Sequence, residues 1–263
     1  MSIPDHRLVV QINWTDVEGY TAWDQPYADW VGANLISVDV QRAAFHKSVR
    51  GETCTVEIAD PGYLIRPLKA SSPLWPNVRL HRRIRVLKRV SPGVFKAVFF
   101  GYLTNIKPDP VAISPPRVTL TAESPLAVLA RRKVEVDEFN NTPVWVGESS
   151  NTGHGILARV MEQTGLIGTN TLQFENVGNQ RIIGTWGGGT SEVGTLLEQM
   201  VGATGCVVSC EPIVQSAPGE LNFVLKWYLP LGNEAPTVTW HNIDRTLEAT
   251  STLTIDYNDT REA

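Results

Sequence analysis

The chain contains 263 residues, of which 42% are hydrophobic and 19% charged, and its formal net charge is −4. Such a chain can bury a core without disulfide or metal support, and its composition argues against wholesale disorder. No uncharged apolar run approaches the roughly 20 residues of a membrane helix, and the first residues lack the apolar stretch of a secretory signal, so folding in a cytoplasm is expected.

Charge is distributed unevenly along the chain. Residues 61–108 contain ten Lys or Arg and no acidic residue, whereas residues 134–263 contain sixteen acidic and five basic residues, a local net charge of −11. This asymmetry indicates a basic face that docks on an acidic neighbour, a nucleic-acid surface, or two halves that neutralise each other within the fold. No known nucleic-acid-binding motif or interleaved aromatic pattern accompanies the basic segment, which disfavours the second possibility.

Apolar residues that alternate at period two predict six strands in the first half of the chain. The predicted strands cover residues 8–12, 36–40, 54–58, 84–86, 98–106 and 118–122. The fifth is predicted from the alternating residues Val98, Phe100, Tyr102, Thr104 and Ile106, which should share one face. Further strands are predicted over 207–213, 221–227, 237–240 and 253–257, the first two joined as a hairpin by an Ala-Pro-Gly turn.

Three helices are predicted. The first covers residues 126–132, with Ser124 as N-cap and Pro125 at the first helical position. The second covers 155–163, and the third follows Thr190-Ser191 and ends near Gly205. The third helix places on one face Val193, Leu196, Leu197, Met200 and Val201. We therefore predict a mainly β (α+β) fold, with a β-barrel over 1–133 closed by the short helix and a small α+β domain over 134–230.

Candidate chemistry is sparse. The histidines lack metal-ligand spacing and are expected at surface or turn positions: His6, His46, His81, His154 and His241. Cys206 and Cys210 would lie about 13 Å apart on one strand at ~3.3 Å per residue, too far to share a disulfide or metal, so both are expected to be small buried residues together with Cys54. The glycines of 186–190 lack the lysine of a phosphate-binding loop.

The N-terminal segment carries carboxylates and aromatic residues that allow a carbohydrate hypothesis. Asp16 with Glu18, or Asp24 with Asp29, could supply the two carboxylates of a glycosidase, although nothing singles either pair out. The aromatic residues could form a sugar-stacking platform or pack one end of a barrel, and packing is favoured: Trp14, Tyr20, Trp23, Tyr27 and Trp30. With no hydrolase or kinase signature present, we predict no catalytic, cofactor or metal site.

A series of short motifs follows in a fixed order between residues 8 and 228. In chain order they are Trp14-Thr15-Asp16-Val17 with Gly19-Tyr20, Arg50-Gly51-Glu52 with residues 54–58, Pro61-Gly62-Tyr63, residues 72–79 (SPLWPNVR), Phe100-Gly101-Tyr102-Leu103, residues 117–122 with 126–129, and Trp186-Gly187 through Gly205 to Trp227. The series resembles the N-terminal half of tail hub (baseplate hub, tail-tip) proteins of tailed bacteriophages and related injection machines.

The resemblance implies a fold and a role. Hub proteins of this kind have tail-tube-like β-barrels with smaller inserted domains, and three copies form a ring that adapts a six-fold tail tube to a three-fold tip or spike. The expected partners are therefore a homotrimeric ring, a tail tube or distal tail protein, the tape measure protein, and DNA passing transiently through the channel. The expected location is the distal end of a virion tail, assembled in the host cytoplasm, with no enzyme activity and no cofactor.

Two departures from the family pattern stand out. The glycine expected after Leu-Arg-Pro is absent, since the sequence at that place is Arg79-Leu80-His81. The sequence also ends at Ala263, where hub proteins usually continue with further domains. We therefore expect a split hub, in which residues 231–263 complete the barrel and a second polypeptide pairs with a C-terminal strand containing Leu253, Ile255 and Tyr257.

The basic strand offers a candidate subunit interface. Arg83, Arg85 and Arg89 should share one face, opposite Ile84 and Val86, and either meet an acidic neighbour or face the channel. Two alternative functions stay open: a distal tail protein, which would form a hexameric ring, and a carbohydrate-binding or carbohydrate-cleaving module, whose glycan binding would be lost in Trp23→Ala.

Overall fold

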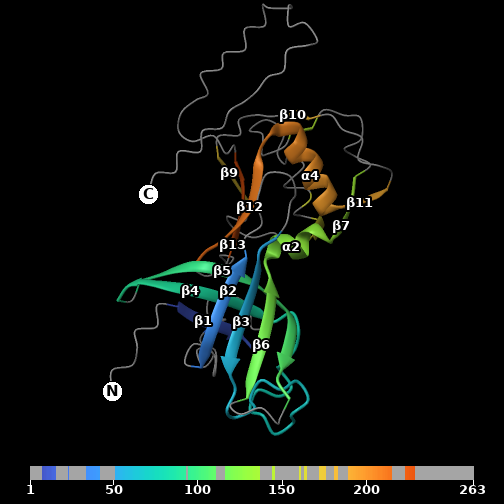
Figure 1. Ribbon diagram of the computed structural model, residues 1–263. Helices are drawn as coiled ribbons and strands as arrows, with labels where there is room; N and C mark the ends of the chain where they lie inside the picture. The colour runs from blue at the N-terminus through green and yellow to red at the C-terminus, as the bar shows by residue number, and fades with distance from the viewer. Residues whose placement is uncertain are drawn as a thin grey trace, which may run out of the picture. The chain divides into compact units, whose positions relative to one another are not determined.

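Strands make up most of the regular structure in the computed structural model, which describes residues 8–15, 23, 34–41, 51–92, 94–110, 116–136, 144–145, 160, 163–164, 172–175, 181–182, 189–214 and 223–228. The largest element is a six-stranded antiparallel sheet with the order β1-β4-β5-β6-β3-β2, curled into a half-barrel (Figure 1). Its strands are β1 (Leu8–Asn13), β2 (Leu35–Gln41), β3 (Thr53–Ala59), β4 (Arg83–Ser91), β5 (Val94–Pro108) and β6 (Arg117–Glu123). This sheet confirms the predicted mainly β fold class.

One face of the sheet buries a core of aliphatic and aromatic side chains, here called the sheet core. Its fully buried large members come from five of the six strands and from the loop between β3 and β4, and include Ile12, Trp14, Ile58, Ile65, Ile84, Phe99, Leu103 and Leu120. The alternation predicted for β1, β3 and β6 is confirmed, because every second residue is buried there, and in β4 it is confirmed for Ile84 and Val86.

The loop from 60 to 82 folds back on the sheet core and closes one of its ends. Asp60 begins it, and its carboxylate accepts hydrogen bonds from the amides of Leu64 at 2.7 Å and Ile65 at 3.2 Å. The Ser72 hydroxyl donates to the Leu64 carbonyl at 2.7 Å and accepts from the Leu74 amide at 3.1 Å. These bonds hold Ile65, Leu74 and Val78 in the core.

A second core lies among the elements that follow β6. These are α2 (Pro125–Ala130), β7 (Lys133–Glu135), β8 (Val144–Trp145), β9 (Leu172–Glu175), β10 (Arg181–Ile182), β11 (Thr190–Glu192), α4 (Val193–Thr204), β12 (Val207–Pro212) and β13 (Phe223–Tyr228). The predicted hairpin is confirmed as the antiparallel pair β12–β13, and β9 adds in parallel to β13. Helix α4 is confirmed as well, since it buries Val193, Leu196, Leu197 and Met200 and ends at Gly205, whose φ is +70°.

Helix α2 begins after Ser124 with Pro125 in its first turn, as predicted, but Ser124 does not cap it through its side chain. The Ser124 hydroxyl instead accepts a hydrogen bond from the Glu52 amide at 3.0 Å, which ties the helix to the start of β3. The helix was expected to close the barrel, whereas its buried Leu126 and Leu129 belong to the second core. The sheet core is closed instead by the loop 60–82.

Strand β5 borders both cores because its side chains alternate between two faces, and two bulges change which residues lie on each face. Val98 is an extra residue opposite β4, and Thr104 is an extra residue opposite β6. Each bulge reverses the face on which the following side chains lie. Between the bulges, Phe99 and Leu103 lie in the sheet core while Phe100 and Tyr102 lie on the side of the second core. The bulges bring Val98 and Ile106 to the side of the sheet core. The prediction that residues 98, 100, 102, 104 and 106 share one face is wrong for this reason.

Strand β2 shows a smaller difference of the same kind. A register shift lies between Leu35 and Ser37, so Ile36 is 44% exposed while Val38 and Val40 pack against the sheet core. The predicted strands over 237–240 and 253–257 and most of the helix over 155–163 lie outside the described residues. The proposed domain boundaries near 133 and 230 remain predictions.

Candidate interaction surface

Strand β4 places its arginines on the face opposite the sheet core, as predicted. Ile84 and Val86 are buried in that core, while Arg83 and Arg85 are half-buried on the other face. The Arg85 guanidinium donates from Nε to Gln11 Oε1 at 2.6 Å and lies 4.3 Å from the centroid of the buried Trp23 ring. Arg85 is thus held by its own chain through a hydrogen bond and a cation–π contact.

The third predicted arginine has a different environment. Arg89 is exposed, and its cross-strand neighbour on β5 is the exposed Phe95. Strand β1 accompanies β4 only as far as Lys88, so Arg89 lies beyond the end of the third strand. The three arginines therefore share one side of β4, but only Arg89 is exposed.

Beyond that point β4 and β5 continue as a two-stranded projection, here called the hairpin arm and defined as Lys88–Pro92 with Val94–Lys96. Its three large apolar residues are exposed: Val90 by 64%, Val94 by 53% and Phe95 by 38%. Lys88 and Lys96 are exposed and lie directly opposite each other in the ladder. Like charges directly opposite each other destabilise the pairing of two strands, so these two lysines do not stabilise the fold through this contact.

Exposed carboxylates occur on the second part of the chain. Glu135 on β7, Glu192 on β11 and Glu198 on α4 are all exposed, and none of the ion pairs formed among the described residues involves them. Glu211 differs, since it pairs with Lys226 at 2.9 Å. The acidic half of the sequence thus presents negative charge on its surface within the described part.

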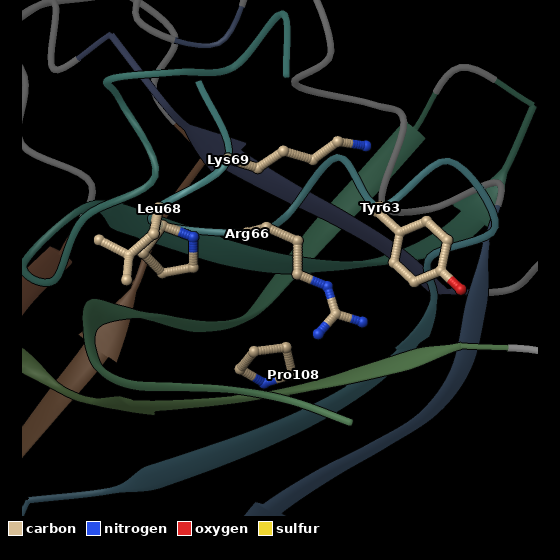
Figure 2. A pocket seen from close by; sticks show the side chains of 6 residues that line it. Tyr63, Arg66, Leu68, Lys69 and Pro108 are labelled. Carbon is tan, nitrogen blue, oxygen red and sulfur yellow. The ribbon is translucent and has the colours of Figure 1, made fainter. Parts of the chain in front are cut away.

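A pocket of about 600 Å³ lies beside the loop 60–82, and its lining is nearly all apolar (Figure 2). Tyr63, Leu68 and Pro108 form much of the wall, and the guanidinium of Arg66 extends toward the space between the Tyr63 ring and Pro108. Arg66 donates from Nη1 to the Asp109 carbonyl at 2.7 Å, and Lys69 donates to the Gly62 carbonyl at 3.1 Å. Both cations stabilise the loop.

Asp60 is a buried carboxyl at the root of this loop. Burial raises its pKa, although hydrogen bonds from the amides of Leu64 and Ile65 and the charges of Arg66 and Lys69 act in the opposite direction. The closest of these charges is the Arg66 Nε atom, 3.7 Å from Asp60 Oδ2. Its hydrogen bonds give Asp60 a structural role in closing the sheet core.

The remaining sequence candidates that the structure describes are packing residues. Trp14 is buried in the sheet core and Trp23 in the second core, where it meets Phe100 edge-on at 6.4 Å between ring centroids. Burial raises the pKa of Cys54 to about 12 and also raises the pKa of Cys210, while Cys206 is equally buried. These findings confirm the packing interpretation of the two tryptophans and the three cysteines.

Other candidates cannot be placed in the fold. Those that lie outside the described residues are Leu253, Ile255 and Tyr257, the carboxylates Asp16, Glu18, Asp24 and Asp29, the aromatic residues Tyr20, Tyr27 and Trp30, the glycine-rich segment 186–188, and all histidines except His81. Within the described part of the chain, no cluster of three or more His, Cys, Asp or Glu side chains could hold a metal ion. Nor is any helix there long and apolar enough to cross a membrane.

Sequence reasoning found the basic residues of the hairpin arm but missed its apolar ones. Val90, Val94 and Phe95 flank the Ser-Pro-Gly turn at residues 91–93, and the signal available in the sequence was large apolar residues on both sides of a turn between lysines. They lie beyond the start of β1, because Leu8, the first described residue of that strand, is opposite Lys88.

No protein-family model matches the sequence, and no curated protein matches it. Among solved structures, the chain is similar to the E. coli c3393 protein, described as a type VI secretion system component with structural similarity to the T4 bacteriophage tail proteins gp27 and gp5. That match has 9% identity and a TM-score of 0.41 over 73% of this chain and 49% of that chain. The chain is also similar to a chain of the Francisella PdpA–VgrG complex, with 8% identity and a TM-score of 0.38 over 86% of this chain and 31% of that chain. It spans about half of the first chain and about a third of the second.

Proposed function

We propose that this chain is a structural component of the tail tip or baseplate hub of a tailed bacteriophage or a related injection machine. In this role it forms a ring that links the tail tube to the tip or spike and surrounds the channel for DNA ejection. The chain acts through its surfaces and its shape, and no catalytic step is part of the proposal.

The observation that carries the proposal is where the family-like motifs fall in the fold. Gly51 packs so closely on α2 that a Cβ atom added to it would lie 2.2 Å from the Ala127 Cβ atom. A Cβ atom added to Gly101 would lie 2.3 Å from the Glu123 carbonyl oxygen. Trp14 is buried in the sheet core. His81, which replaces the family glycine, has a φ of 64°, a conformation that favours glycine. Motif positions with special backbone or packing demands, in and beside one sheet, support a shared fold better than the motif letters alone.

The proposed partners follow from the ring. Three copies of the chain form it, a tail tube or distal tail protein lies on one side, and the tape measure protein and then DNA pass through its channel. Arg83, Arg85 and Arg89 are the proposed interface residues, of which Arg89 is the accessible one. The proposed location is the distal end of the virion tail.

Immunogold electron microscopy on particles purified from the source of the sequence tests this proposal. An antibody against the chain should place gold only at the distal end of tails. Particles without gold, although the same antibody detects the protein in the lysate, would overturn the tail assignment. The mass of the labelled ring then separates a trimeric hub from a hexameric distal tail ring.

The split hub remains a separate part of the proposal. A second polypeptide would pair with the predicted strand that contains Leu253, Ile255 and Tyr257. Deletion of residues 253–263 should abolish capture of that polypeptide from assembled tails, whereas capture of the tail tube protein should persist. Equal capture of both by the truncated chain would contradict the split.

The carbohydrate hypothesis gains no support from the described residues. A stacking platform needs exposed aromatic faces, but Trp14 and Trp23 are 1% and 4% exposed and pack in the two cores. Loss of glycan binding in Trp23→Ala would in any case be confounded by loss of the Phe100 contact.

A further inference from the structure

Among the described residues, the hairpin arm extends past the strands that flank β4 and β5. Leu8, the first described residue of β1, lies opposite Lys88, and β6 pairs with β5 only from Tyr102 onward. Beyond Lys88, the ladder partners described for the arm come from the arm itself, with Arg89 opposite Phe95 and Ser91 opposite Val94. Such a two-stranded ribbon is marginally stable alone and gains stability when another surface covers it.

The chemistry of the arm points to a protein partner rather than to nucleic acid. Its cations, Lys88, Arg89 and Lys96, lie toward the base of the arm, and the exposed Val90, Val94 and Phe95 lie between them and the turn or beside it. Phosphate backbones are bound by cations and polar groups, whereas aliphatic side chains gain nothing from them. A protein interface, by contrast, combines an apolar centre with charged residues at its rim.

We propose that the hairpin arm docks on the acidic part, residues 134–263, of a second copy of this chain. The inference deepens the proposed function and rests on it, because the second copy is taken to be the neighbour in the ring. The apolar residues of the arm are buried by the neighbour, and Lys88 and Lys96 lie against its carboxylates.

Charge complementarity selects the second copy as the occupant. The segment that contains the arm, residues 61–108, has ten cations and no acidic residue, while residues 134–263 have a net charge of −11. Within the described part, Glu135, Glu192 and Glu198 are exposed and belong to no ion pair. A copy of the chain therefore carries both halves of a head-to-tail contact, the type that closes into a ring.

Sedimentation velocity of the full chain as a function of concentration and salt tests the charges. Lys96→Glu should weaken self-association about tenfold, because it removes an attraction to the carboxylates and adds a repulsion. Self-association of the wild type should fall with added salt. Lys107→Glu is the matched control, since Lys107 is also exposed on β5 and in the basic segment but lies far from the arm. Equal weakening by both variants would mean that overall charge, not the arm, drives association.

A second variant tests the apolar residues. Phe95→Ser should weaken self-association by a similar factor without changing the thermal unfolding midpoint of the dilute chain, because Phe95 lies on the arm and outside both cores. A chain that stays monomeric at all concentrations and salt conditions would overturn the proposal. So would a monomeric chain that binds duplex DNA with an affinity lost in Lys96→Glu, which would make the arm a nucleic-acid surface.

Cross-linking locates the docking site without relying on any variant's effect on stability. Photoactivated p-benzoylphenylalanine in place of Val94 should give a cross-linked dimer whose peptides join residue 94 of one copy to residues 134–263 of another. Cross-links to residues 1–133, or only within one copy, would contradict the proposal. If gold labels the tail tip but the arm variants self-associate like the wild type, the docking proposal fails and the tail role stands. If the chain self-associates through the arm but no tail is labelled, the tail role fails and the docking proposal stands.

Discussion

Gly101 lies where β5 crosses close to the end of β6. A Cβ atom at this position would be 2.3 Å from the Glu123 carbonyl oxygen and 2.7 Å from the Phe99 ring, and backbone cannot move aside as a flexible side chain can. We expect Gly101→Ala to lower the free energy of unfolding by about 1–3 kcal/mol, the usual cost of overpacking. Urea denaturation followed by tryptophan fluorescence measures this change.

Gly202 provides the control for that substitution. It is exposed in α4, and a Cβ atom there would meet nothing within 4 Å. Gly202→Ala should therefore raise the free energy of unfolding by about 1 kcal/mol through helix propensity. Opposite signs for the two Gly→Ala changes are the expected result, and a gain in stability from both would show that β5 and β6 are not in close contact.

His81 carries backbone strain that a glycine would not. Its φ is 64°, a region that costs other residues about 1–2 kcal/mol. Its amide still donates to the Leu103 carbonyl at 2.7 Å, and that bond does not depend on the side chain. We expect His81→Gly to raise the free energy of unfolding by about 0.5–1 kcal/mol, after subtraction of the larger entropy of glycine in the unfolded chain. His81→Ala, which keeps the strain, should give no comparable gain in the same denaturation experiment.

Asp60 should leave a pH signature in stability. Because burial raises its pKa in the folded state, the folded chain binds a proton there more readily than the unfolded chain. The free energy of unfolding contributed by this group therefore falls as pH rises from about 4, near the unfolded pKa, through the raised folded pKa. The stability of the wild type relative to Asp60→Asn should accordingly fall between about pH 3 and pH 7 in urea titrations. A relative stability that rises over this range would mean that the amides and cations around Asp60 outweigh burial.

At the scale of elements, regular alternation was sufficient to predict β1, β3, β4 and β6, since one face of each lies on the sheet core. Helix α4 was equally predictable from its apolar face and terminal glycine. Strand β5 was also predicted as a strand, but its bulges at Val98 and Thr104 were not, because they depend on how the neighbouring strands pair and leave no period in the sequence. Those bulges decide that Val98 and Ile106 pack on the opposite side of the sheet from Phe100 and Tyr102.

The same limit applies to the candidate interface. The sequence located Arg83, Arg85 and Arg89 on one face of β4, because side chains alternate along any strand. It could not indicate that Gln11 and the Trp23 ring hold Arg85, since these residues lie 74 and 62 positions away in the chain. It also could not reveal that β1 begins opposite Lys88 or that Val90, Val94 and Phe95 beyond this point are exposed.

At the scale of the whole molecule, the charge asymmetry turns into a prediction that separates assembly from folding. Arg85 is half-buried and hydrogen-bonded to Gln11, so Arg85→Glu should lower the free energy of unfolding and also weaken ring assembly. Arg89 is exposed at the start of the arm, and Arg89→Glu should weaken assembly and increase its sensitivity to salt while lowering the free energy of unfolding less than Arg85→Glu does. Urea denaturation of the dilute chain and sedimentation across a salt series measure the two quantities separately. If Arg89→Glu assembles like the wild type while Arg85→Glu does not, the effect of Arg85 is one of folding, and the basic face of β4 is not the subunit interface.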